Sequence, residues 1–143
     1  MTYLPDINVW IALAVAEHVH HAPATAWAEA AASDLLAFCR VTQMGFLRLL
    51  TNPQIMGGDE LTSARAWSLL DSFYLDDGIV FVEEPAGIES RWRALTRHSR
   101  FGRNMWTDAY LAAFAGTGGH TLITFDAGFT RYKDAPIRVL PTT

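Results

Sequence analysis

The sequence lacks several features that would place it in a large class of proteins. It has one cysteine, Cys39, so it cannot form an internal disulfide, which fits a reducing cytoplasm. It has no uninterrupted apolar run of about 18 residues, the length that a membrane-spanning helix requires. Its first residues include an acid and no basic stretch, unlike a signal peptide. We therefore expect a cytoplasmic protein without a membrane segment.

The sequence does not favour a zinc site or a catalytic cysteine. It has no paired cysteines and no His-Glu-x-x-His spacing, so His20, His21 and His98 do not indicate a zinc site. Cys39 follows Phe38 and precedes a helical pattern, which favours a small buried side chain over a nucleophile.

The order of apolar segments predicts the fold class. The 143 residues, half of them hydrophobic, suit a single domain, residues 1–143, with a full-sized core. The predicted strands are residues 3–5, 35–38, 79–82, 121–124 and 137–140. Stretches of helical periodicity separate them, including one that begins at Pro85 and one that starts at a cap on Asn104 and ends in the glycines at 116–119. This alternation predicts an α/β fold, a three-layer α/β/α sandwich with a mostly parallel central sheet.

Three aspartates lie where predicted strands end or helices begin. Asp6 follows the strand at 3–5, Asp126 follows the strand at 121–124, and Asp108 lies early in an alanine-rich helix. In an open α/β sheet the carboxyl ends of the strands and the helix starts above them form one rim, so these acids can meet in a cleft. A cluster of carboxylates without cationic partners is typical of a Mg²⁺ or Mn²⁺ site.

Each aspartate also has a purely structural interpretation. Asp6 can cap a helix N-terminus, Asp126 can bond its own backbone in a turn, and Asp108 in a first helical turn complements the helix dipole. For all three to lie on the same rim by accident is a weaker explanation than a shared site.

Basic residues gather immediately before Asp108. The net charge of −4 argues against a general nucleic-acid-binding surface. Yet five of the eleven Lys and Arg residues fall within thirteen positions: Arg91, Arg93, Arg97, Arg100 and Arg103. This stretch is either a solvated helix face or a rim that contacts phosphates. Arg100 and Arg103, nearest to Asp108, are the predicted substrate contacts.

Three short motifs together resemble a known family. In chain order they are Asp6-x-Asn8, Thr107-Asp108-Ala109-x-Leu111-Ala112-Ala113, and Thr124-x-Asp126. Their order and spacing resemble the PIN-domain ribonucleases and, among these, the VapC toxins of bacterial type II toxin–antitoxin pairs. The resemblance extends from residue 3 to about residue 140.

The resemblance implies Mg²⁺- or Mn²⁺-dependent hydrolysis of an RNA phosphodiester. It implies that Asp6 and Asp108 bind the metal, and that Asp126 completes the site directly or through water, or orients the nucleophile. Asn8 and Thr124 would support them, the Asn8 amide by donating to Asp6 or to a metal-bound water. A VapB-like antitoxin and a homodimer are the implied partners.

One acid of the family pattern is missing. The family usually places a further acid, commonly Glu, on the helix after the second strand, but residues 39–48 contain no carboxylate. Gln43 or Gly45 occupies the expected region, and Gln43 can hold a metal-bound water through its amide. Glu17, Asp34 or Asp134 can substitute only if the fold brings one of them to the site. The number of metal ions is therefore open.

Two other functions remain open. The first is a PIN-like module that has lost its metal site and only binds RNA or protein, for which the missing acid is the motive. The second is a phosphatase that uses Asp6 as a nucleophile. The phosphatase class usually has Asp-x-Asp after its first strand, whereas here the second position is Asn8.

Overall fold

The computed structural model describes residues 1–142 and is built around one parallel sheet. Its five strands run in the order β3-β2-β1-β4-β5. Their bounds are β1 (Thr2–Pro5), β2 (Leu35–Phe38), β3 (Ile79–Phe81), β4 (Thr121–Thr124) and β5 (Ile137–Val139). Every pair of neighbours is parallel, so all carboxyl ends lie at one edge of the sheet. The predicted strands and their parallel arrangement are confirmed.

Helices connect the strands. They are α1 (Ile7–Ala14), α2 (His21–Ala30), α3 (Arg40–Leu50), α4 (Pro53–Met56), α5 (Ser63–Phe73), α6 (Ile88–Thr96), α7 (Met105–Gly118) and a short 3-10 helix, η1 (Ala127–Arg131). None of these, over the described residues, combines the length and apolar character needed to cross a membrane.

Three predicted helix ends need correction. The helix expected from Pro85 begins at Ile88, after a turn. Asn104 does precede α7, but its side chain makes no capping hydrogen bond. That helix also continues through the first glycines to Gly118, and its C-cap is Gly119, whose φ of 73° lies in the left-handed region that glycine adopts without strain.

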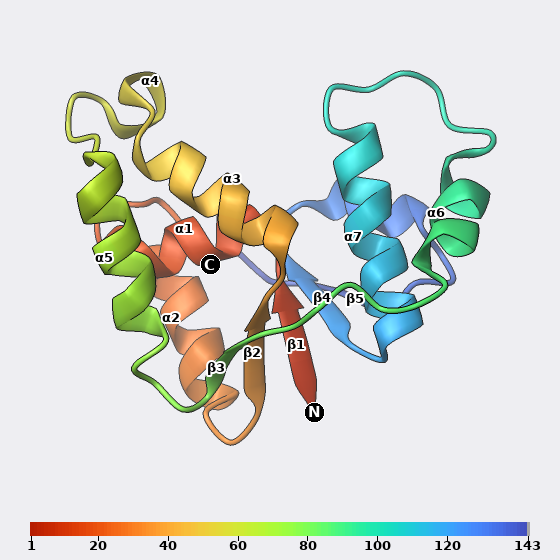
Figure 1. The fold of residues 1–143 in the computed structure, drawn as a ribbon, viewed down its shortest axis with the longest axis horizontal. Helices are drawn as coiled ribbons and strands as arrows, with labels where there is room; N and C mark the ends of the chain where they lie inside the picture. The colour runs from red at the N-terminus through yellow and green to blue at the C-terminus, as the bar shows by residue number, and fades with distance from the viewer. Residues whose placement is uncertain (143) are drawn as a thin grey trace.

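The helices form two layers, one on each face of the sheet (Figure 1). Helices α1, α2, α3 and α5 pack with Leu36, Phe38 and Ile123 in one core. Helices α6 and α7 and η1 pack with Leu4 and Leu122 in the other. Adjacent residues of β4, Leu122 and Ile123, therefore enter opposite cores, as the alternation of side chains along a strand requires. The predicted three-layer sandwich is confirmed.

Helices α1 and α3 touch at a glycine. A Cβ on Gly45 would lie 2.6 Å from Ile7 Cγ1 and closer still to its Cδ1. Ile7 is β-branched and opens α1 directly after Asp6, so it has little freedom to move aside. Gly45 therefore lets α3 pack closely over the start of α1.

We predict that Gly45→Ala destabilises the protein. Overpacking costs about 1–3 kcal/mol, more than the roughly 0.5–1 kcal/mol that alanine adds to a helix over glycine. The free energy of unfolding, measured by urea denaturation, should fall by about 1 kcal/mol. In an Ile7→Ala background the same change should be neutral or stabilising, and Met44→Ala, at an exposed position of the same helix, should have little effect. Equal losses with and without Ile7 would contradict the steric explanation.

Candidate active site

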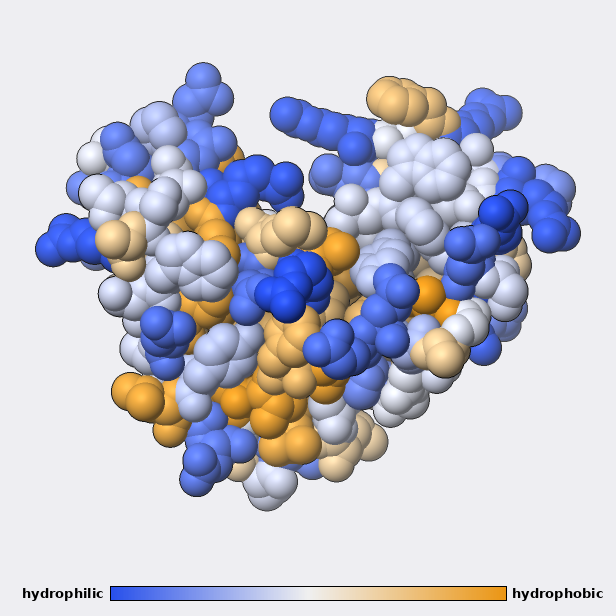
Figure 2. All heavy atoms as spheres, in the orientation of Figure 1, coloured by the Kyte–Doolittle hydropathy of each residue, from blue (hydrophilic) through white to orange (hydrophobic). Residues whose placement is uncertain are grey.

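A cleft of about 620 Å³ lies above the carboxyl ends of β1 and β4. Its lining includes the three predicted aspartates, Asp6, Asp108 and Asp126. One wall is formed by residues of α3 and α4, including Arg48, and the other by the start of α7, including Thr107, with Arg103 just before it. Figure 2 shows the surface hollowed between these two groups of helices.

Asp6 is the buried member of the site, with 5% of its surface exposed. Its Oδ1 accepts hydrogen bonds from the backbone N–H groups of Asn8 (2.9 Å) and Val9 (3.2 Å), so it caps α1. Its Oδ2 accepts a hydrogen bond of 2.5 Å from the Thr124 hydroxyl. Each carboxylate oxygen offers about two acceptor positions, so one on Oδ2 is left for another ligand.

Burial raises the pKa of Asp6 from its ordinary value of 3.8 to about 6. The hydrogen bonds from Thr124, Val9 and Asn8 lower this pKa, and the charge of Asp108 raises it further. Burial outweighs the three hydrogen bonds, so ionising Asp6 in the folded protein costs more free energy than ionising an exposed aspartate.

Thr124 connects Asp6 to the third aspartate. Its hydroxyl donates to Asp6 and accepts from the backbone N–H of Asp126 at 3.0 Å. The Asp126 side chain is exposed and accepts from the Gly128 N–H at 2.7 Å, which makes the local turn that the sequence allowed. The end of β4 thus positions two carboxylates at once.

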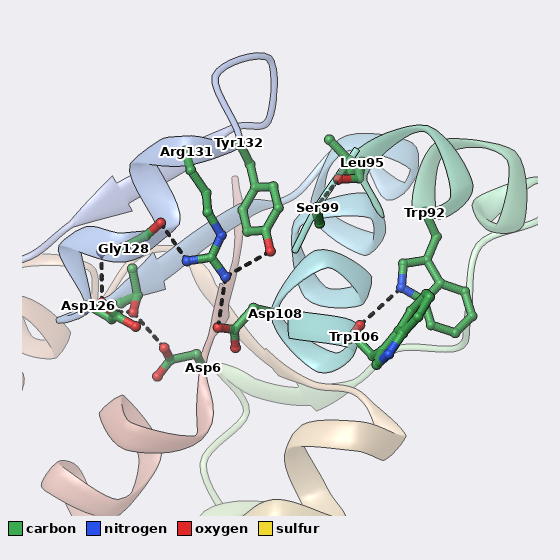
Figure 3. Close-up of polar contacts among 11 residues, drawn as sticks. Asp6, Trp92, Leu95, Ser99, Trp106, Asp108, Asp126, Gly128, Arg131 and Tyr132 are labelled. Atoms are coloured by element: carbon green, nitrogen blue, oxygen red, sulfur yellow. Dashed lines mark hydrogen bonds and ion pairs between the residues drawn. The ribbon is translucent and has the colours of Figure 1, made fainter. Parts of the chain in front are cut away.

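Asp108 has a cationic partner, which corrects the expectation of carboxylates without one. Arg131 lies between the acids in Figure 3, and its Nη2 is 3.4 Å from Asp108 Oδ2. The guanidinium also donates to the Tyr132 hydroxyl (2.9 Å) and the Gly128 carbonyl (3.0 Å), and it packs over the Tyr132 ring. Burial raises the pKa of Asp108, and the charge of Arg131 opposes that rise.

Sequence reasoning missed Arg131. It lies at the end of η1, five positions after Asp126, where a lone arginine resembles any basic residue in a last helical turn. Its partner Asp108 is 23 positions away in the sequence. Only the packing of η1 beside α7 brings the two together, and no short motif records that.

Asn8 and Gln43, the two amides expected to support the acids, lie differently with respect to the cleft. The Asn8 side chain lines the cleft, but its contact with Asp6 runs through the backbone N–H, because Asn8 occupies the first turn of α1. Gln43 is buried outside the cleft lining, where it accepts a hydrogen bond from Arg40 and donates to the Tyr74 hydroxyl at 3.5 Å. These contacts direct the Gln43 amide to Arg40 and Tyr74, and a role in holding a metal-bound water stays a prediction.

The predicted arginines border the site. Arg103 lines the cleft, and Arg100 lines an adjoining pocket of about 450 Å³ that shares Arg103 and Asp108 with it. The three acids considered as substitutes for the missing one, Glu17, Asp34 and Asp134, do not line the cleft.

As they stand in residues 1–142, no three Asp, Glu, His or Cys side chains are close enough together to hold a metal ion. The hydrogen bonds explain this, because Arg131 holds Asp108 and the Gly128 N–H holds Asp126. The donors themselves fit Mg²⁺ or Mn²⁺, since the available ligands in the cleft are carboxylate oxygens. The unmatched charge of Asp6 points to the same kind of ligand.

Comparisons with known proteins agree with this geometry. Residues 3–135 match the family described as PIN domain. The chain is 44% identical over 142 residues to ribonuclease VapC41 of Mycobacterium tuberculosis, a match that covers 96% of this chain and 97% of the relative. The chain belongs to the VapC family of PIN-domain proteins. This VapC chain is also 32% identical over 145 residues to ribonuclease VapC29 of the same bacterium, over 100% of this chain and 99% of the relative.

Two solved VapC structures share the fold. One is VapBC2 from Rickettsia felis bound to a DNA fragment from its promoter, with a TM-score of 0.72, 15% identity, and coverage of 99% of this chain and 100% of that one. The other is the M. tuberculosis toxin VapC20, which cleaves the sarcin–ricin loop, with a TM-score of 0.67, 18% identity and the same coverage.

We predict that Asp6→Asn stabilises the metal-free protein at neutral pH. The folded pKa of Asp6, about 6, exceeds its ordinary value of 3.8, so the folded state binds this proton more tightly. The stability that the proton provides is complete below about pH 4 and is lost as the pH rises through 6. Asparagine keeps the helix cap and carries no charge. At pH 8 with a chelator, the free energy of unfolding of the variant should exceed that of the parent by about 1–3 kcal/mol.

The advantage of Asp6→Asn should shrink towards zero at pH 4, as measured by chemical denaturation across this range. Asp77→Asn, which changes an exposed carboxylate before β3, should show no such trend. A variant less stable than the parent at pH 8 would show that the hydrogen bonds of the carboxylate outweigh its burial.

Proposed function

We propose that this VapC chain is a Mg²⁺- or Mn²⁺-dependent endoribonuclease and the toxin of a toxin–antitoxin pair. The observation that carries the proposal is the meeting of Asp6, Asp108 and Asp126 in one cleft, with the pKa of the buried acid raised. The names of the relatives, ribonucleases VapC41 and VapC29, support RNA as the substrate.

The residues divide the work as follows. Asp6 and Asp108 would hold the cation, Asp6 through Oδ2, and Asp126 would complete the site or orient the attacking water. Thr124 keeps Asp6 in place by its hydrogen bond. Arg48 and Arg103, on opposite walls of the cleft, are placed to contact the phosphates on either side of the cut bond. A bound divalent cation supplies the acidity that activates water and the positive charge that stabilises the attacked phosphate.

A single cation site is the simplest reading of this cleft. The family's additional acid has no counterpart, because Gly45 packs against Ile7 and Gln43 faces Arg40 and Tyr74. The missing acid and the Arg131–Asp108 ion pair favour, as a second candidate, a catalytically weakened module that binds RNA or protein. An aspartyl-phosphate phosphatase lacks the second acid of its motif, which is Asn8 here.

A VapB-like antitoxin is the proposed partner. The structural neighbour from Rickettsia felis is described as VapBC2, and the likeness to it extends over 99% of this chain. A homodimer is part of the same proposal. The molar mass in solution, measured for the protein by itself and for its mixture with the antitoxin, tests both.

We predict that the purified protein cleaves structured RNA only when Mg²⁺ or Mn²⁺ is present. Asp6→Asn and Asp108→Asn should each lower the rate by about 100-fold or more, because each removes a carboxylate that holds the cation. Gel analysis of end-labelled RNA measures both effects. Asp77→Asn should cleave like the parent, because Asp77 precedes β3 at the opposite edge of the sheet.

Two results would overturn the nuclease. One is the absence of cleavage with either metal, which would leave the binding module. The other is equal cleavage by the parent and both carboxylate variants, which would identify a contaminating ribonuclease.

We predict that Arg131→Gln tightens the binding of Mn²⁺ in the absence of RNA. Arg131 pairs with Asp108 and so competes with a cation for the same carboxylate. Half-exposed ion pairs of this kind contribute about 0.2–1 kcal/mol, so the apparent Kd should fall roughly 1.4- to 5-fold. Calorimetric titration measures it, with Arg138→Gln, away from the cleft lining, as the control. Unchanged or weaker binding would show that Arg131 does not compete with the metal.

A further inference from the structure

The loop between α6 and α7 presents an aromatic side chain to solvent. Phe101 is 90% exposed and lies between two arginines, Arg100 and Arg103. In Figure 1 this loop lies beyond the ends of both helices, on the side of the cleft that α7 forms. Figure 2 shows an apolar patch on this part of the surface with hydrophilic side chains on both sides of it.

Core packing does not account for Phe101. It belongs to neither hydrophobic core. Other aromatics join the two helices that the loop connects: Trp92 Nε1 donates to the Trp106 carbonyl at 3.0 Å, and the Trp92 ring packs edge-on against Tyr110. A polar residue at position 101 would satisfy the fold equally well.

The loop is continuous with the candidate active site. Arg100, Gly102 and Arg103 line the pocket of about 450 Å³ that also contains Asp108 and Arg131. Phe101 stands between these lining residues in the chain, and its own side chain extends into solvent next to them. A ligand that reaches from Asp108 to the loop therefore meets the residues on both sides of Phe101 in the chain.

The charges around Phe101 favour a polyanion. Within residues 1–142, none of Arg97, Arg100 and Arg103 forms an ion pair, whereas Arg93, on the adjoining helix, pairs with Glu89. Three guanidinium groups without ion pairs, all within four positions of an exposed aromatic residue, are the combination of side chains that binds single-stranded nucleic acid. Phosphates contact the cations and a base stacks on the ring. A protein partner with an apolar face would leave these three arginine charges without counter-charges, which disfavours such a partner.

We propose that Phe101 is a stacking platform for an unpaired RNA base whose neighbouring phosphates contact Arg100 and Arg103. The inference rests on the proposed nuclease function and assigns to Phe101 the contact with a base of the bound RNA. Bases within a duplex are already stacked on one another and present no free face to the ring.

Binding by the uncleaving Asp6→Asn protein tests the proposal. The probes are a short single-stranded RNA, with 2-aminopurine placed at each position in turn, and a blunt duplex of the same sequence. At one position we expect the 2-aminopurine fluorescence to be quenched on binding. Adding Phe101→Ala should abolish that quenching and weaken binding of the single strand about 5- to 100-fold. Phe101→Tyr should retain both, and duplex binding should be weak with either residue.

Leu75→Ala is the matched control, because Leu75 is 85% exposed and precedes β3 at the edge of the sheet opposite the cleft. It should change neither quenching nor affinity. If the parent cleaves RNA but Phe101→Ala binds and quenches like Asp6→Asn alone, stacking is wrong and the nuclease stands. If the protein neither binds nor cleaves RNA, both fail. A loss of self-association on Phe101→Ala, with RNA affinity unchanged, would assign the ring to a protein interface.

Discussion

The hydrogen bond from the Thr124 hydroxyl to Asp6 Oδ2 is the interaction on which this site depends. It joins the carboxyl ends of β1 and β4, which are neighbours in the centre of the sheet, and the Asp6 backbone N–H reinforces the junction by bonding the Ile123 carbonyl at 2.8 Å. A carboxylate can be buried only if its oxygens are satisfied. Asp6 meets this requirement with Thr124 and the first N–H groups of α1, so the same side chain starts a helix and forms the floor of the cleft.

Electrostatics then distinguish the three carboxylates. Asp6 is buried and forms no ion pair within residues 1–142, Asp108 is partly buried and held by Arg131, and Asp126 is exposed. Burial raises the pKa of the first two, and only the second has a positive charge that opposes the rise. The protein alone therefore leaves negative charge uncompensated at its most buried point. A divalent cation would remove that imbalance, and it would also take over from Arg131 as the partner of Asp108.

The sequence predicts much of this arrangement because the signals involved are local. Two apolar strands that lead directly to an acid place Asp6 and Asp126 at one edge of a parallel sheet without any knowledge of packing. Thr124 follows from the same motif. Arg131 and Gln43 show where this reasoning ends. Whether Arg131 faces Asp108, and whether Gln43 faces the cleft or Tyr74, depends on how η1 and α3 lie against other elements, and neither residue has a local pattern that encodes it.

The acids on the floor of the cleft repel RNA phosphates, and nearby arginines can offset this repulsion. A net charge of −4 and three carboxylates repel RNA, so affinity for a phosphate backbone must come from local positive charge. In the proposed function Arg48 would supply it on one wall, and Arg103 and the α6–α7 loop would supply it on the other. The carboxylates therefore lie on strand ends and helix starts fixed by two cores, whereas the proposed RNA contacts lie largely on the α6–α7 loop. Such a loop can change its sequence without disturbing the carboxylates, so selection among RNAs can change while the cutting chemistry stays the same.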